Sequence, residues 1–147
     1  MVVFIYFSIN FISPNMQKII SISFVFLVIF LFSSCKKVEG QGGSSTIKGT
    51  INVQKYDFVG TLLAEYPGAE LDVYIVYGEG NTFYNDRIRT SYDGSFEFNY
   101  LEEGEYTIFV YEDNNSVPSG KSEVLVTAKI AGKKTTVDLG TIDTKKY

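Results

Sequence analysis

Apolar and polar residues alternate along much of the chain after residue 46, which is the period of a β-strand with one buried face. The clearest example follows Asp93-Gly94, a turn dipeptide in which glycine supplies the positive φ that other residues resist. Gly104 marks a second turn. Apolar side chains occupy every second position on both sides of it: Phe96, Phe98 and Tyr100 before, and Tyr106, Ile108 and Val110 after. The pattern predicts a β-hairpin.

The same alternation predicts further strands near residues 46–53, 69–77, 82–90, 124–130 and 135–142. Tyr56 to Tyr66 is ambiguous, because Val59, Leu62 and Leu63 fit either a short strand or an irregular crossover. About seven strands, with turns roughly every ten residues and no amphipathic helix, predict an all-β fold with a single antiparallel β-sandwich. The residues expected in its core are Phe96, Phe98, Tyr106, Ile108, Val73 and Ile75.

The first 32 residues have a different pattern, being nearly all apolar or small with Lys18 as their only charge. The run from Ile19 to Phe32 carries no charge and has the length of a signal-peptide hydrophobic region, which is short for a bilayer span. We therefore predict that a signal peptide occupies residues 1–34. Because Met16 opens a complete signal by itself, we hypothesise that translation starts there.

The segment Leu31-Phe32-Ser33-Ser34-Cys35 resembles a bacterial lipoprotein signal, with Phe32 where that family prefers leucine. The resemblance implies that Cys35 is the mature N-terminus and carries acyl chains, which would make a membrane the partner of this residue. The implied location is the bacterial cell envelope, at the outer membrane or the cell surface. The alternative is an incidental cysteine behind an uncleaved helix. Removing Met1 to Ser34 removes only Lys18, so the formal net charge changes from -4 to -5.

Residues 35–45 are rich in glycine and serine and lack apolar periodicity, so the sequence predicts a flexible linker there. The sandwich domain is then expected to span residues 46–147.

The predicted hairpin is similar to the end of carboxypeptidase-regulatory-like domains, which have a transthyretin-like (prealbumin-like) β-sandwich. Such domains carry Asp-Gly, then Phe-x-Phe, then Leu-x-x-Gly-x-Tyr, represented here by Asp93-Gly94, Phe96-Glu97-Phe98 and Leu101 to Tyr106. Ile47-Lys48-Gly49-Thr50-Ile51 fits the first strand of that family. The resemblance implies a non-catalytic binding or structural module, and it supplies no active-site motif.

Composition argues against several kinds of chemistry. The chain has no histidine, which removes the commonest general base and metal ligand, and its one cysteine allows no intramolecular disulfide. A formal net charge of -4 argues against nucleic-acid binding. We expect no cofactor and no catalytic or metal-binding residue. The acidic or polar groups Asp113-Asn114-Asn115 and Glu102, Glu103 and Glu105 are better explained as turns than as a calcium site or a hydrolase dyad.

Three aromatic residues are the candidates for ligand binding. Tyr74, Phe109 and Tyr111 fall on the strand faces opposite the aliphatic residues, where they would form a patch on the outside of one sheet. The sequence therefore favours a lipid-anchored, non-enzymatic interaction or structural module of the cell envelope. One alternative is a surface lipoprotein that binds a glycan or peptide through the aromatic face, and a weaker alternative is a hydrolase that uses acidic residues.

Overall fold

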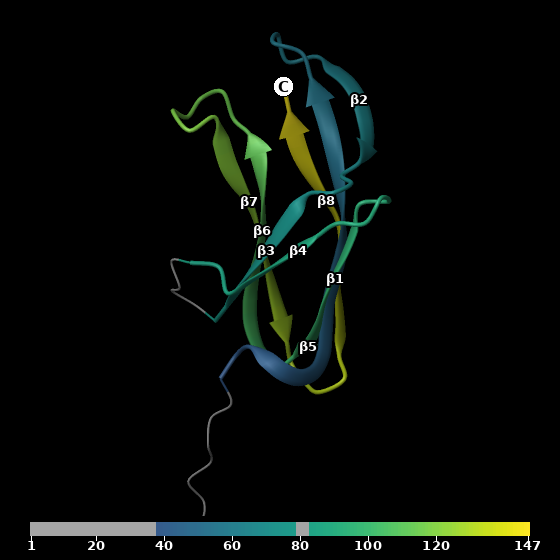
Figure 1. Cartoon of the computed structure of the whole chain (residues 1–147), viewed down its shortest axis with the longest axis vertical. Coiled ribbons are helices and arrows are strands. Elements are labelled where there is room, and N and C mark those ends of the chain that lie inside the picture. Colours follow the sequence, from purple (N-terminus) through teal and green to yellow (C-terminus); the bar gives the residue numbers. More distant parts are fainter. Residues whose placement is uncertain (1–37, 79–82) are drawn as a thin grey trace, which may run out of the picture. The chain divides into compact units, whose positions relative to one another are not determined.

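The computed structural model describes residues 38–78 and 83–147. The predicted signal peptide, the alternative start at Met16 and the predicted lipidation site at Cys35 lie outside these residues. Among the described residues no helix is long and apolar enough to span a membrane. They form eight strands and no helix, so the prediction of an all-β sandwich is confirmed (Figure 1).

The first layer, sheet A, is built around the long strand β1, Gln41–Tyr56. One edge of β1 pairs with two strands in succession: β5, Ser95–Leu101, along its first part, and β2, Leu62–Pro67, along its last part. The other edge pairs with β8, Thr136–Lys146. The β1–β8 pairing is parallel, whereas the other pairings in the sandwich are antiparallel.

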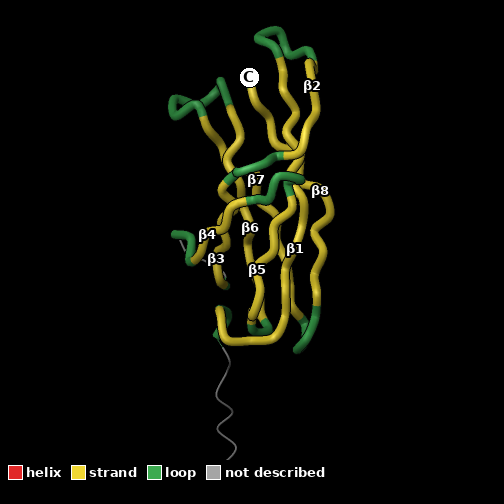
Figure 2. Tube along the Cα trace, turned by 45° about the vertical axis from the view of Figure 1, so that its right-hand side comes forward, coloured by secondary structure: helices red, strands yellow, loops and turns green. Residues whose placement is uncertain are grey.

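The second layer, sheet B, has the strand order β4-β3-β6-β7. Its members are β3, Asp72–Tyr77; β4, Asp86–Arg89; β6, Gly104–Asp113; and β7, Lys121–Ile130. Figure 2 shows the two layers with the strands of both running along the long axis of the domain.

The core lies between the layers and takes one face from each strand except β2, whose residues are all exposed. The six residues predicted for the core are all buried, which confirms the facing of β3, β5 and β6. Every residue of the core cluster lies between Ile47 and Ile142, so this part of the chain holds a complete core. We therefore expect the domain to fold without the N-terminal segment.

The predicted hairpin is β5 and β6, and the turn before it is held by Asp93. The Asp93 carboxylate accepts hydrogen bonds from the backbone N–H and the hydroxyl of Ser95, at 3.0 and 2.7 Å. Gly94 has φ +80°, and a Cβ there would lie 2.4 Å from the Ile51 carbonyl oxygen. The turn therefore requires glycine both for its conformation and for its close approach to β1.

The predicted linker is in part wrong, because residues 41–45 belong to β1. Gln41 and Ser45 both pair with Leu101 across a bulge in the ladder. Between them, a Cβ on Gly43 would lie 1.9 Å from the Leu101 carbonyl oxygen, so glycine here permits close packing. Ser45 is buried, its hydroxyl donates to the Gly132 carbonyl at 3.0 Å, and it accepts the Thr135 N–H at 3.1 Å.

The buried Tyr106 hydroxyl fixes the chain just before β1. It accepts the Gly40 N–H at 3.1 Å and donates to the Glu102 carbonyl at 2.8 Å. Burial raises the pKa of Tyr106. The ordered part of the domain consequently begins by Gly40, six residues earlier than the sequence predicts.

Candidate functional site

The three aromatic residues singled out from the sequence lie together on the outer face of sheet B. Tyr74 in β3 and Phe109 in β6 face each other directly in the antiparallel register. Tyr111 is two residues further along β6, on the same face. The neighbours Val73, Ile75, Ile108 and Val110 are buried in the core, so the alternation of each strand directs the rings outward.

The rings of Tyr74 and Phe109 form the centre of the group. Their centroids lie 4.9 Å apart and their planes differ by 11°. Near-parallel rings at this distance are stacked, and an offset arrangement is the preferred one. Each ring therefore shields part of one face of the other.

Two further tyrosines pack against the stacked pair. The ring of Tyr111 meets those of Tyr74 and Phe109 at 5.6 Å each, with interplanar angles of 76° and 85°. Tyr84 meets Tyr74 at 4.8 Å and 62°. Tyr111 is 47% exposed and Tyr84 is 51% exposed, whereas Tyr74 and Phe109 are only partly exposed. We call these four residues the aromatic patch, and its accessible rings are those of Tyr111 and Tyr84.

Sequence reasoning missed Tyr84. It falls in the stretch 82–90 that the sequence predicts as a strand, but β4 begins only at Asp86, so the predicted alternation does not place the Tyr84 ring. The residue reaches the patch because β4 pairs with β3, which brings the start of β4 beside the Tyr74 strand. Only the composition could have indicated a role for Tyr84: the aromatic pair Phe83-Tyr84 lies just before a short, charged strand.

Charged groups border the patch on the β4 side. Arg87 lies opposite Tyr74 in the register, and its guanidinium forms an ion pair with Asp72 at 3.3 Å. A hydrogen bond to Tyr74 and the negative charge of Asp72 raise the pKa of Arg87.

A polar hollow of about 410 Å³ opens on sheet B, at the end of β6 away from the patch. Its lining includes Gly78, Glu105, Thr107, Thr127 and Lys129. Lys129 and Glu105 form an ion pair at 2.8 Å across β6 and β7. Along β6 the outward residues therefore change from charged and hydroxylic groups at Glu105 and Thr107 to aromatic rings at Phe109 and Tyr111.

At the other candidate sites, the charged side chains are already paired within the protein. A second hollow, of about 480 Å³, holds the cations Lys48 and Arg89, and both are already in ion pairs, with Asp138 and with Glu70 and Asp72. In the loop at Asp113, the carboxylate binds Lys121 Nζ and accepts the Tyr147 N–H. Within residues 38–78 and 83–147 no group of three or more acidic, cysteine or histidine side chains could hold a metal ion.

Comparison with known proteins adds little to this geometry. No family model matches the sequence, and no curated protein gives a significant match. Two solved structures are similar in part. A candidate carbohydrate-binding protein from Pseudomonas aeruginosa is 12% identical, with a TM-score of 0.39 over 73% of this chain and 91% of that protein. (S)-allantoin synthase is 8% identical, with a TM-score of 0.35 over 71% of this chain and 42% of that one. Scores this low carry no argument about function.

Proposed function

We propose that the domain is a non-catalytic module that binds a glycan on the aromatic patch while acyl chains on Cys35 hold it at a membrane of the bacterial cell envelope. The observation that supports glycan binding is the pair of accessible rings, Tyr111 and Tyr84, supported from beneath by stacked aromatic side chains. Fixed rings lose little conformational entropy when a ligand binds.

The chemistry of the outer face suits a sugar. The C–H groups on one face of a pyranose ring form an apolar surface that can contact an aromatic ring, while its hydroxyl groups need hydrogen-bond partners. The patch offers the first kind of contact. The polar hollow, with Thr107, Thr127 and the Glu105–Lys129 pair, offers the second on the same strands.

A protein or peptide is the second candidate ligand. It corresponds to the interaction or structural module that the sequence favours. The observation that favours it is Leu125, which lies opposite Phe109 in the β6–β7 register and is 64% exposed. An exposed aliphatic side chain beside aromatic rings is more typical of a protein interface than of a sugar site. The hydrolase alternative is less favoured, because Glu105 of the acidic turn is paired with Lys129.

The glycan proposal can be tested with the domain from residue 38 onward on a glycan array, followed by titration calorimetry with the sugar that binds. Tyr111→Ala and Tyr84→Ala should each weaken binding by at least about fivefold, since an aromatic contact contributes on the order of 1 kcal/mol. Tyr92→Ala is the matched control, because Tyr92 is exposed and lies outside the patch. Equal affinity in all variants would show that the sugar binds elsewhere, and binding of proteins alone would favour the second candidate.

Membrane anchoring is proposed from the resemblance of residues 31–35 to a lipoprotein signal. Cys35→Ser should release the protein from the membrane fraction or leave it as an unprocessed precursor, because the acyl chains would be missing. Mass spectrometry of the wild-type protein should show an acylated N-terminus at Cys35. Unchanged fractionation and mass in the variant would contradict the anchor. The resemblance of residues 93–106 to carboxypeptidase-regulatory-like domains supports the other part of the proposal, that the module is non-catalytic.

A further inference from the structure

The β1–β2 hairpin carries exposed apolar side chains at one end of the domain. Its tip, residues 57–61, lies at the end of β1 opposite to the end where β1 begins (Figure 1). Phe58 is 94% exposed and Val59 is 86% exposed. Leu62 and Leu63, the first residues of β2, are exposed as well. These four exposed apolar residues lie in or directly next to the turn, and we call them the apolar tip.

Hydrogen bonds hold this tip in one conformation. The Asp57 carboxylate accepts the N–H groups of Val59 at 3.0 Å and Thr61 at 2.7 Å. The backbone closes the turn through Asp57 N–H to the Thr61 carbonyl at 3.0 Å and Gly60 N–H to the Asp57 carbonyl at 3.1 Å. These bonds lower the pKa of Asp57, with the Thr61 N–H as the main cause. Phe58 and Val59 are therefore presented outward by an ordered turn.

The fold does not need these side chains. All six residues of β2 are exposed, and no member of the core cluster lies between Ile51 and Leu71. An apolar tip that contributes nothing to the core exposes hydrophobic surface at a cost in solubility, so a binding role is the simplest physical reason for it.

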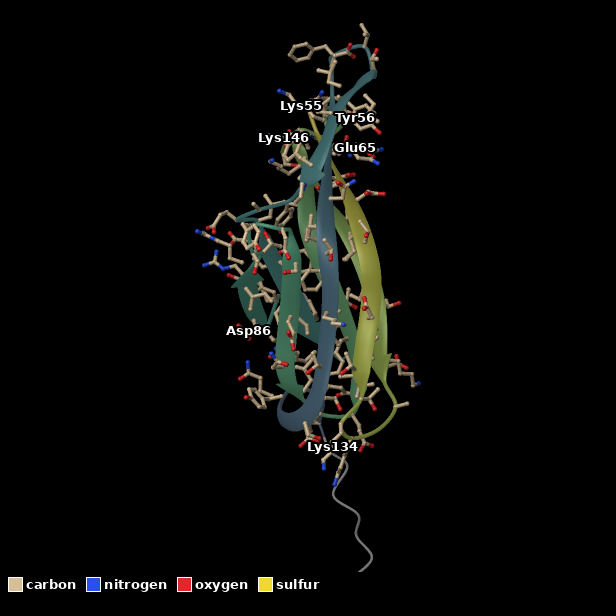
Figure 3. The ribbon with its side chains drawn as sticks, turned by 90° about the vertical axis from the view of Figure 1, so that its right-hand side faces the viewer. Lys55, Tyr56, Glu65, Asp86, Lys134 and Lys146 are labelled. Carbon is tan, nitrogen blue, oxygen red and sulfur yellow. The ribbon has the colours of Figure 1, made fainter. Side chains whose placement is uncertain are left out.

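Aromatic and basic residues lie together just behind the tip. Tyr56 and Tyr147 have ring centroids 6.1 Å apart. Lys55 lies beside Lys146 in the parallel β1–β8 register, and Figure 3 shows Lys55, Tyr56 and Lys146 just behind the hairpin tip. Lys145 is adjacent. An apolar end bordered by tyrosine and lysine suits the region where a bilayer changes from acyl chains to headgroups.

Three exposed lysines at this end can contact an anionic partner. Lys55, Lys145 and Lys146 are exposed, and none of their ammonium groups forms an ion pair within the described part of the chain. The nearby carboxylates already accept hydrogen bonds from the protein itself: Asp57 from the turn, Glu65 from Gln54 at 2.9 Å, Glu112 from the Lys145 N–H at 3.2 Å, and Asp113 from the Tyr147 N–H at 3.1 Å.

We propose that the β1–β2 hairpin tip binds the surface of an anionic phospholipid bilayer. Phe58 and Val59 enter the boundary between headgroups and acyl chains, the tyrosines lie at the level of the headgroups, and the three lysines contact lipid phosphates. Apolar burial and electrostatic attraction add in such interfacial binding. A protein pocket would also accept Phe58, but the tyrosines and lysines that border the apolar tip match a lipid surface better.

The position of the tip gives this contact a direction. β1 bends at its start, where Gln41 and Ser45 both pair with Leu101, so its straight part from Ser45 to Tyr56 spans about 36 Å at about 3.3 Å per residue. If Cys35 carries the acyl chains proposed above, the anchor precedes the start of this strand, whereas the tip lies beyond its other end. This point rests on the proposed anchor, whereas lipid binding by the tip does not.

The test is co-sedimentation of the domain from residue 38 onward, which lacks Cys35, with vesicles of phosphatidylcholine containing about 30% phosphatidylglycerol. The wild-type domain should bind these vesicles and bind pure phosphatidylcholine more weakly. Phe58→Ser combined with Val59→Ser should weaken binding at least about tenfold, because the apolar contact is lost. Lys55→Ser should weaken it by about fivefold and reduce its sensitivity to salt.

Tyr92→Ser is the control, since it removes an exposed aromatic ring away from the tip. Its vesicle binding should equal that of the wild type, and all variants should keep the wild-type melting temperature. Absence of vesicle binding, or equal binding by the Phe58/Val59 double variant, would overturn the inference; docking to a protein pocket would give the first of these results. A failure here leaves glycan binding by the aromatic patch and acylation of Cys35 untouched, because neither is measured in this experiment.

Discussion

The outer faces of the two sheets differ sharply although both sheets direct aliphatic side chains into one core. Polar side chains on sheet A pair across neighbouring strands: Lys48 with Asp138, Asn52 with Asp143, and Thr46 with Asn99. The outward-facing residues of sheet B instead include the aromatic patch. Sheet A shows that polar side chains are sufficient to keep an outer face soluble and stable. Aromatic rings are not required for that purpose on sheet B, and we therefore interpret them as a binding surface.

The largest predicted effect separates the inner from the outer positions of one strand. Phe98 is buried and Glu97 is exposed on the other face of β5. Phe98→Ala should lower the free energy of unfolding by about 3–5 kcal/mol, because it removes buried surface and leaves a cavity. Glu97→Ala should change it by less than about 0.5 kcal/mol. Urea unfolding measures both, and equal midpoints would show that the facing of β5 is misassigned.

A second prediction compares two tyrosines of β6 that point to opposite faces. Tyr106→Phe removes the hydroxyl that binds Gly40 N–H and the Glu102 carbonyl, so the free energy of unfolding should fall by about 1–3 kcal/mol. Tyr111→Phe, on the exposed patch, should leave it nearly unchanged. Hydrogen exchange should show faster exchange of the Gly40 amide only in the first variant. Wild-type protection of that amide in Tyr106→Phe would contradict the role of this hydroxyl.

A third prediction makes the outer face of sheet B resemble that of sheet A. Tyr74→Thr keeps a residue that favours strands but removes the centre of the aromatic patch. We expect a loss of about 1 kcal/mol in the free energy of unfolding, and weaker ligand binding because Tyr111 and Tyr84 lose their support. Asn52→Thr, the matched substitution on sheet A, should lower the free energy of unfolding by less. Thermal melts test stability, and an unaltered contact between the rings of Tyr111 and Phe109 in NMR spectra would argue against the supporting role of Tyr74.

The smallest predicted effect concerns the contact between the sheets at Asp113. The hydrogen bond from Lys121 is the main cause that lowers the pKa of Asp113, which also accepts the Tyr147 N–H beyond β8. Because this pKa is lower when the protein is folded, the carboxylate stabilises the fold above its ordinary pKa. That contribution disappears as the pH falls through the folded pKa.

Asp113→Asn should therefore be slightly less stable than the wild type at neutral pH, and the difference should shrink as the pH falls below about 4. Melting temperatures across this range measure it. A difference that stays constant with pH would assign the effect of the substitution to something other than the charge.

The sequence predicts best what depends on local alternation. The β5–β6 hairpin, the buried faces of β3 and β6, and the outward direction of Tyr74, Phe109 and Tyr111 all follow from a period of two. In β5 the alternation holds at Phe96 and Phe98 but fails at Tyr100, which has a positive φ and is exposed, whereas Leu101 is buried. Prediction from the sequence also fails where a residue has two physical roles. Gly43 has the composition of a flexible linker, but it is needed for close packing against Leu101. Only the tertiary structure distinguishes these roles.

Long-range pairing is the other part that the sequence does not show. Nothing in residues 136–146 indicates that β8 runs parallel to β1, because alternation fixes the face of a strand but not its neighbour or direction. Tyr84 joins the patch for the same reason, through the β3–β4 register. β2 is exposed throughout, so it lacks the buried face that would have distinguished a strand from a crossover in the ambiguous segment.

The parallel pairing of β1 with β8 also sets a condition on the order of folding. Register partners such as Ile51 and Ile142 are separated by most of the domain, so the loop between them must close before the central strand gains its second neighbour. Folding rates fall as contacts become more distant in sequence. A growing chain therefore cannot complete sheet A until its last strand has emerged. During that interval the edge of β1 that later pairs with β8 has unpaired backbone groups, so it is open to other strands or to chaperones.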